Sequence, residues 1–192
     1  MNKVKIVVAF HSGYGHTKKQ AESVAAGITD VAGVGVQMIN VADLNDHVWA
    51  ALAEADGIVF GSPTYMGGVS ADFKKFADAS SKAWMQQQWK NKIAGGFTNS
   101  ATMNGDKGST IQYLITFAMQ HSMIWVGTGL MPANSSSATR NDVNYVGGFS
   151  GALAQSPSDA SPEVAPPAGD LETARLYGVR IATLTKQFKG VA

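Results

Sequence analysis

Apolar and polar positions along the chain form blocks that switch repeatedly between two periods. Residues 4–10 are apolar at nearly every position and end at a loop with two glycines, which is typical of a fully buried parallel strand. From Thr17 to Ile28 the apolar residues recur at helical spacing, and Gly33 ends the pattern. A strand, a glycine loop and a helix in this order predict the first half of a βαβ unit.

The same alternation continues as far as residue 127. The pattern predicts further strands over 35–41, 57–61, 93–98 and 123–127, and further helices over 45–55, 71–81 and 110–120. Such alternation favours an α/β fold, a doubly wound parallel sheet of five strands with helices on both faces. Because a domain has on average about 150 residues, we expect the 192 residues to form a single domain over 1–192.

Residues 131–169 interrupt this pattern. Paired glycines at Gly147-Gly148 and four prolines between Pro157 and Pro167 predict an irregular insertion before the last helix. A segment of this length without regular structure is usually either functional or a solvated linker, and the sequence leaves both interpretations open. The last helix is predicted to begin at Asp170 as its N-cap, with Ala174 and Ile181 on its apolar side.

Composition excludes several classes of function. The chain has no cysteine, which excludes disulfides, thiolate nucleophiles, iron–sulfur clusters and cysteine zinc sites. A net charge of +1 and only three arginines argue against nucleic acid as a partner. His11 and His16 are not at metal-ligand spacing on a helix, so we expect no metal. No apolar run reaches the about 18 residues of a membrane span, and we expect a cytoplasmic protein.

The loop that follows the first predicted strand carries the clearest binding signal. It offers the hydroxyls of Ser12 and Thr17, the glycines Gly13 and Gly15, and the unpaired amides of a helix N-terminus. The loop lacks both the P-loop string and the third glycine of a dinucleotide fingerprint, and it has no acid for magnesium. Two interpretations remain: a site for a singly esterified phosphate, or a simple turn with an N-cap.

Three loops together resemble a known family. The S-x-x-G-x-T pattern of Ser12, Gly15 and Thr17 resembles the FMN site of flavodoxin-like proteins. Residues 63–67 resemble the P-T-x-x-G loop that packs along the isoalloxazine, and residues 98–105 resemble the loop that hydrogen-bonds its pyrimidine side. Their order and spacing over nearly the whole chain resemble the WrbA-type NAD(P)H:quinone oxidoreductases.

This resemblance implies FMN as the cofactor, with NAD(P)H and a quinone as substrates. In the implied ping-pong reaction, flavin N5 accepts a hydride from NAD(P)H, and the quinone then takes two electrons in the same pocket. Tyr14 and Trp84 are expected to form walls of the substrate pocket, and His121 is the expected catalytic hydrogen-bond or proton donor to the quinone. The resemblance also implies a homo-oligomer, a tetramer or a dimer. The residues expected to bind FMN are Ser12, Gly13, Tyr14, Gly15, His16, Thr17, Pro63, Thr64, Tyr65, Met66, Gly67, Thr98, Asn99, Ser100, Ala101, Thr102, Met103, Asn104 and Gly105.

Structural and functional alternatives stay open for these residues. Trp84 equally fits an anchor that holds an extension onto its own helix, and the position of His121 before a strand favours a hydrogen-bonded core histidine over a catalytic one. Two other functions remain open for the protein: a flavodoxin-type electron carrier and an NAD(P)H-dependent FMN reductase. Flavodoxin-type carriers are usually strongly acidic, so the net charge of +1 favours the quinone reductase over the carrier.

Overall fold

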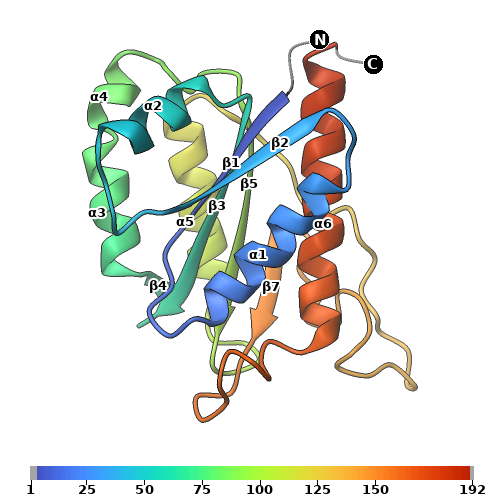
Figure 1. The fold of residues 1–192 in the computed structure, drawn as a ribbon. Helices are drawn as coiled ribbons and strands as arrows, with labels where there is room; N and C mark the ends of the chain where they lie inside the picture. The colour runs from blue at the N-terminus through green and yellow to red at the C-terminus, as the bar shows by residue number, and fades with distance from the viewer. Residues whose placement is uncertain (1–3, 191–192) are drawn as a thin grey trace.

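A parallel β-sheet lies between two layers of helices in the computed structural model, which describes residues 4–190 (Figure 1). The strands are β1 (Val4–Phe10), β2 (Val34–Asn40), β3 (Gly57–Tyr65), β4 (Gly68–Val69), β5 (Ile93–Ser100), β6 (Ile124–Trp125) and β7 (Ala152–Gln155). The helices are α1 (His16–Thr29), α2 (Asp46–Glu54), α3 (Ala71–Ala79), α4 (Ser81–Met85), α5 (Lys107–Gln120) and α6 (Ala168–Phe188).

The main strands are parallel and lie in the order β2-β1-β3-β5-β6, which confirms the predicted doubly wound, flavodoxin-like arrangement. The chain moves from β1 outward to β2 and then crosses to β3 on the other side of β1. In open parallel sheets a ligand binds beyond the carboxyl ends of the strands where the winding reverses. The fold therefore directs attention to the loops that follow β1 and β3.

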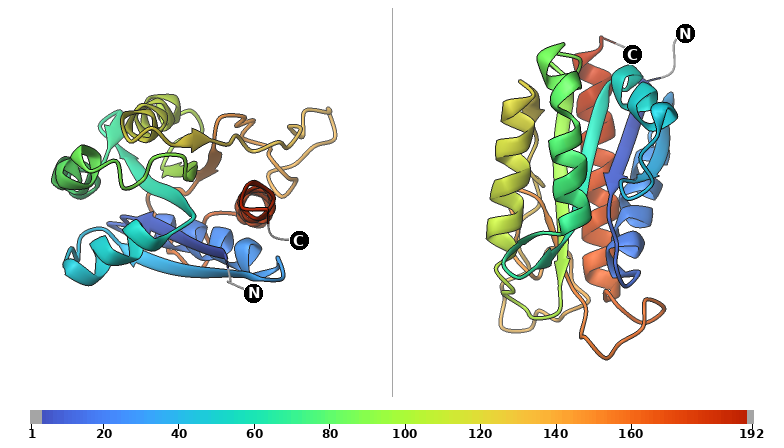
Figure 2. Two further views of the ribbon diagram at one scale, coloured as in Figure 1. Left: turned by 90° about the horizontal axis from the view of Figure 1, so that it is seen from above. Right: turned by 90° about the vertical axis from the view of Figure 1, so that its left-hand side faces the viewer.

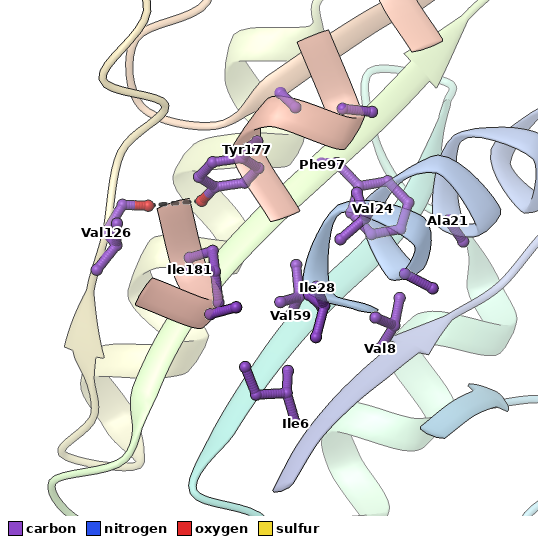
Figure 3. Packing of buried hydrophobic residues seen from close by; sticks show 14 of the residues in the cluster. Ile6, Val8, Ala21, Val24, Ile28, Val59, Phe97, Val126, Tyr177 and Ile181 are labelled. Carbon is purple, nitrogen blue, oxygen red and sulfur yellow. Dashed lines mark hydrogen bonds between the residues drawn. The ribbon is translucent and has the colours of Figure 1, made fainter. Parts of the chain in front are cut away.

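Each face of the sheet has its own apolar core. On one face Ile6 and Val8 of β1 pack with α1 and α6, and Figure 3 shows Val24 and Tyr177 from these helices in that layer. On the other face Val7 packs with residues of α2, α3 and α5. Both sides of β1 are buried because successive strand residues point to opposite faces, which explains its continuous apolar run. Figure 2 shows the sheet edge-on between the two helical layers.

Two glycines allow α1 and α6 to touch through their backbones. A Cβ atom at Gly27 would lie 1.8 Å from the carbonyl oxygen of Arg175, and one at Gly178 would lie 2.1 Å from that of Val24. No side chain fits at either position without separating the helices. Gly27 and Gly178 therefore set how closely these helices cover their face of the sheet.

The fifth position of the sheet is divided between two segments, and this corrects the prediction for 131–169. β6 pairs with the first residues of β5, and β7, which lies inside the predicted irregular segment, pairs in parallel with Phe97–Ser100 at the other end of β5. Residues 126–151 leave the sheet between them. The Tyr177 hydroxyl donates to the Val126 carbonyl where the chain departs (Figure 3). β7 was missed because its short, alanine-rich sequence lacks the β-branched residues that indicate a strand.

Several predicted boundaries also change. β3 and β5 extend to Tyr65 and Ser100, α5 begins at Lys107, and the predicted helix over 71–81 is divided into α3 and α4. Asp170 is not the N-cap of α6: the helix begins after Pro167, and the buried Asp170 carboxylate accepts hydrogen bonds from Arg140 and from the Gln155 amide. Among residues 4–190, no helix combines the length and apolar character needed to cross a bilayer.

Candidate functional site

Four segments meet beyond the carboxyl ends of the strands and enclose a cavity of about 540 Å³. This volume lies within the usual range of about 300–1,000 Å³ for small-molecule sites. Three of the segments are the predicted loops, and the fourth follows β7. The lining residues are Ser12, Tyr14, His16, Thr17, Pro63, Thr64, Tyr65, Asn99, Ser100, Ala101, Ser156, Ser158, Ala160 and Pro162.

The β1–α1 loop presents a helix N-terminus to this cavity. Gly15 caps α1 with a φ of 90°, a left-handed conformation that glycine adopts without strain. The Ser12 hydroxyl accepts hydrogen bonds from the amides of Gly15 and Lys18, both at 3.1 Å. The amides of His16 and Thr17, in the first turn, have no carbonyl of α1 to bond, because the first four amides of any helix lack one. They are therefore available to an anion in the cavity.

The charges around the loop also suit an anion. Neither aspartate nor glutamate is among the lining residues, and the partial positive charge of the α1 N-terminus faces the cavity. His16 donates from Nε2 to the Ala160 carbonyl at 2.9 Å, which ties the loop to the fourth segment. Thr17 is buried and is one of the residues that line the cavity. The residues present fit a phosphate monoester.

The carboxyl end of β3 contributes an aromatic wall. A Cβ atom at Gly13 would lie 2.6 Å from the Tyr65 hydroxyl, so the absence of a side chain at Gly13 allows Tyr65 to reach over the loop. Burial raises the pKa of Tyr65, which keeps its hydroxyl protonated. The rings of Tyr14 and Tyr65 meet edge to face, with centroids 6.1 Å apart. Met66 and Gly67 turn outward with positive φ and do not line the cavity.

A buried hydroxyl network lies behind this wall. The Thr64 hydroxyl is 2.8 Å from the Thr98 hydroxyl and 2.8 Å from that of Thr110 on α5. Thr98 is fully buried and is not among the residues that line the cavity. Thr64 thus both borders the cavity and connects the sheet with α5, while Thr98 supports it from the neighbouring strand.

The loop after β5 lines the cavity only in its first part. Asn99 accepts a hydrogen bond from the Ser156 hydroxyl at 3.0 Å, and Ser100 and Ala101 complete this wall. The predicted contacts Thr102, Met103, Asn104 and Gly105 lie farther along the loop, outside the lining. Asn99 and Ser100 are placed by their strand pairing with β7.

Sequence reasoning missed the fourth segment, which supplies Ser156, Ser158, Ala160 and Pro162. It follows β7 directly, and the Ser156 amide donates to the Ser100 carbonyl at 3.0 Å. Its position depends on the long-range pairing of β7 with β5. Serines and prolines in an irregular region carry no periodic signal, so only the recognition of β7 would have placed this segment at the cavity.

His121 and Trp84 lie at the other end of the sheet. His121 follows α5 and precedes β6, is buried, and has Nε2 2.9 Å from the Ser80 hydroxyl. Ser80 donates to the Ala77 carbonyl, so it accepts from His121 Nε2. Burial lowers the pKa of His121 to about 4, so the ring is neutral near pH 7. Within this chain neither residue reaches the cavity, and a hydrogen-bonded core histidine describes the surroundings of His121.

His11, which directly follows β1, also binds other protein side chains. His11 Nδ1 is 2.8 Å from the Ser70 hydroxyl, and its Nε2 is 3.3 Å from the Asp72 carboxylate. In the part of the chain that the structure describes, no three potential metal ligands form a group.

The comparison with protein families agrees with this geometry. A family model described as NADPH-dependent FMN reductase matches residues 3–137. The chain belongs to this family. With its flavodoxin-like fold and its relatives it is of the WrbA type, and membership implies a flavin cofactor.

Individual relatives of this family member carry two kinds of name. "Flavodoxin FldP" of Pseudomonas aeruginosa is 48% identical over 183 residues, covering 95% of this chain and 97% of that protein. An "NAD(P)H dehydrogenase (quinone)" of Geotalea uraniireducens is 31% identical and covers 94% of this chain and 97% of its own length. The crystal structure of a flavodoxin, WrbA-like protein from Agrobacterium tumefaciens has a TM-score of 0.76 and 44% identity, covering 96% of this chain and 98% of that one.

Proposed function

We propose that this protein binds FMN in the cavity and catalyses the two-electron reduction of quinones by NAD(P)H. The observation that carries the proposal is the convergence of the β1–α1 loop with the carboxyl ends of β3 and β5 around one cavity. Its wall combines a helix N-terminus, hydroxyls and an aromatic side chain without any carboxylate. The quinone dehydrogenase relatives support the reaction class.

The chain's own residues would bind and orient the cofactor. The amides of His16 and Thr17, with the Thr17 hydroxyl, would hold the phosphate, while Ser12 keeps the loop closed. Tyr65 and Tyr14 would pack against the ring system, and Asn99 to Ala101 would line its other side. Bound FMN would supply the hydride chemistry at N5, so no acid or base from the protein is required at that atom.

A ping-pong reaction is the proposed sequence of events. One open pocket beside the flavin would take NAD(P)H and then the quinone in turn, and the exposed Tyr14 at the edge of the cavity would contact either substrate. Parallel lines in double-reciprocal plots of rate against NAD(P)H at several quinone concentrations are expected. Intersecting lines would contradict the shared pocket.

The activity is tested by measuring NADH and NADPH oxidation by the purified, FMN-loaded protein with and without benzoquinone. We expect a yellow protein whose NAD(P)H oxidation rises strongly with benzoquinone and does not depend on further added FMN. A rate that follows the concentration of free FMN would instead identify a reductase that releases reduced flavin. Failure to quench the fluorescence of FMN at saturating concentrations would remove the cofactor and the proposal together.

An electron carrier is the second candidate, supported by the 48% identity to Flavodoxin FldP. A carrier would exchange electrons with a protein partner and would oxidise neither nicotinamide quickly. The net charge of +1 gives little steering toward a basic partner, which favours the enzyme. The benzoquinone measurement separates the two functions directly.

We also infer that the protein forms a homo-oligomer through the excursion 126–151. Met131, Tyr145 and Phe149 on this excursion expose 80%, 37% and 57% of their surface, and exposed large apolar residues are a typical feature of protein–protein interfaces. Sedimentation velocity is expected to show a dimer or tetramer. A monomer at all concentrations with undiminished turnover would rule out this assembly.

A further inference from the structure

One lysine is enclosed beneath the loop that follows β5. Lys107, the first residue of α5, is 1% exposed, and its ammonium group donates to the carbonyls of Thr102 at 2.8 Å and Met103 at 2.7 Å. The Asn104 carbonyl lies 3.4 Å away on the same side. The carbonyls of residues 102–104 thus converge on a single buried cation.

This convergence fixes the direction of the peptide amides. In a planar trans peptide the N–H of one residue points opposite to the carbonyl of the residue before it. Because the carbonyls of Thr102 and Met103 point inward to Lys107, the amides of Met103 and Asn104 point to the outer side of the loop. Within residues 4–190 these two amides donate to no protein acceptor. Outward-facing amides over a buried cation form a favourable place for negative charge.

The charge of Lys107 is only partly balanced by its surroundings. Asp170 of α6 is the buried acid that faces it, and the Asp170 carboxylate is bound by Arg140 at 3.0 and 2.6 Å. Two cations therefore accompany one buried carboxylate. Burial lowers the pKa of Lys107 to about 8, so the side chain is still largely protonated at pH 7.

The same charged group is connected to the cavity wall. The Gln155 amide donates to Asp170 at 2.8 Å, and the Gln155 side chain donates to the Ala101 carbonyl at 2.6 Å. Ala101 lines the cavity. Lys107 thus binds the carbonyls of the loop after β5, while Asp170 binds the backbone of β7 at Gln155.

We propose that Lys107 is a positioning residue that holds the loop amides outward and, through its positive charge, favours reduced over oxidised FMN. This inference rests on the proposed function, because it places the pyrimidine side of the flavin against Asn99 to Ala101, which line the cavity and continue directly into the residues bound by Lys107. Two-electron reduction of FMN with uptake of one proton adds one negative charge to the ring. A cation beneath the loop therefore stabilises the reduced form more than the oxidised form.

The test compares Lys107→Met with wild type in the FMN-loaded full chain. The dissociation constant of oxidised FMN is measured by fluorescence quenching, and the midpoint potential of bound FMN by spectroelectrochemistry. We expect Lys107→Met to weaken reduced FMN about tenfold more than oxidised FMN. For a two-electron couple that ratio corresponds to a midpoint potential lower by about 30 mV.

A matched control is present at the other end of β5. Lys92 is also partly buried, also has its pKa lowered by burial to about 8, and donates to the carbonyls of Leu52 and Ala53. Lys92→Met should leave the potential of bound FMN unchanged. Lys107→Arg, which retains the charge, should return the potential most of the way to the wild-type value.

An unchanged potential in Lys107→Met would overturn the inference, because it would mean that both oxidation states are weakened equally and that Lys107 has a structural role alone. If Lys107→Met does not fold, Lys107→Gln decides by the same criterion, because it retains a hydrogen-bond donor without the charge. Failure of the proposed activity is recognised separately. A lowered potential in a protein that does not reduce benzoquinone would support the role of Lys107 and remove only the enzyme.

Discussion

The two ends of the parallel sheet differ both in the kinds of residue that they contain and in what these residues do. At the carboxyl end, loops rich in serine, threonine and glycine surround a cavity, and Thr17 and Tyr65 are directed into it. At the amino end, the rings of His121 and Trp89 lie against each other with centroids 4.0 Å apart and are tilted by 31°, and both side chains are enclosed by the core. Histidine and tryptophan attract functional interpretations, yet here they stabilise packing, while small hydroxyl residues form the site.

Topology explains this difference better than residue type. All main strands are parallel, so every loop that follows a strand lies at one end and every segment that precedes one lies at the other. Residues 11–15 follow β1, whereas His121 precedes β6. The position of a residue relative to its strand therefore decides whether it can reach the cavity, and the following predictions test the division.

The largest effect is expected at the amino end. Trp89 is fully buried and packs on Phe60, Phe76 and His121. Trp89→Ala should lower the free energy of unfolding by about 3–5 kcal/mol, as removal of a large buried aromatic does. Urea denaturation measures the change. Trp84→Ala is the matched control, because Trp84 is 45% exposed and should cost less than about 1 kcal/mol.

Acid should weaken the same end through His121. Its folded-state pKa of about 4 lies below the usual value of 6.5, so between these pH values the unfolded chain binds more protons than the folded one. Stability should be complete above pH 6.5 and fall by up to about 3 kcal/mol as the pH drops toward 4. In His121→Gln this part of the pH dependence should disappear in denaturant titrations. An unchanged pH profile would contradict the assignment.

The sequence allowed the fold to be predicted more completely than the set of residues that surround the cavity. Apolar runs and glycine loops predicted β1, α1 and the doubly wound order, because local periodicity carries that information. The split fifth strand depends on β7 pairing with β5 across a long excursion, and no local pattern in residues 152–155 indicates it.

The candidate site likewise has a part that local sequence predicts and a part that depends on contacts between distant segments. The location of the β1–α1 loop could be predicted, because Ser12, Gly15 and Thr17 lie within about one turn of the start of their own helix. The fourth wall and the buried Lys107 could not be predicted, since both depend on contacts with segments distant in sequence. The family resemblance predicted a place for His121 in the site. Only the structure shows that His121 is buried against Trp89 instead.

At the carboxyl end the effect should be on binding rather than on folding. Thr17→Ala removes a hydroxyl from the cavity wall and should weaken FMN binding by about 1.5–3 kcal/mol, as expected for a hydrogen bond to a charged group. Titration of FMN fluorescence measures the change. Thr17→Ser retains the hydroxyl and should bind FMN nearly as tightly as wild type. Equal affinity of Thr17→Ala and wild type would remove Thr17 from the phosphate site.

The smallest effect is expected where the two kinds of region meet, in the threonine network behind the cavity wall. Thr110→Val retains the shape of the side chain but removes the hydroxyl that accepts from Thr64 at 2.8 Å. Thr64 still has Thr98 as a partner, and it borders the cavity, where water can replace the lost bond. Unfolding in urea should therefore show a loss of only about 1 kcal/mol. FMN affinity should change less than in Thr17→Ala, because Thr110 does not line the cavity. A larger loss of FMN binding in Thr110→Val would mean that the wall is positioned by this network rather than by the strand ends.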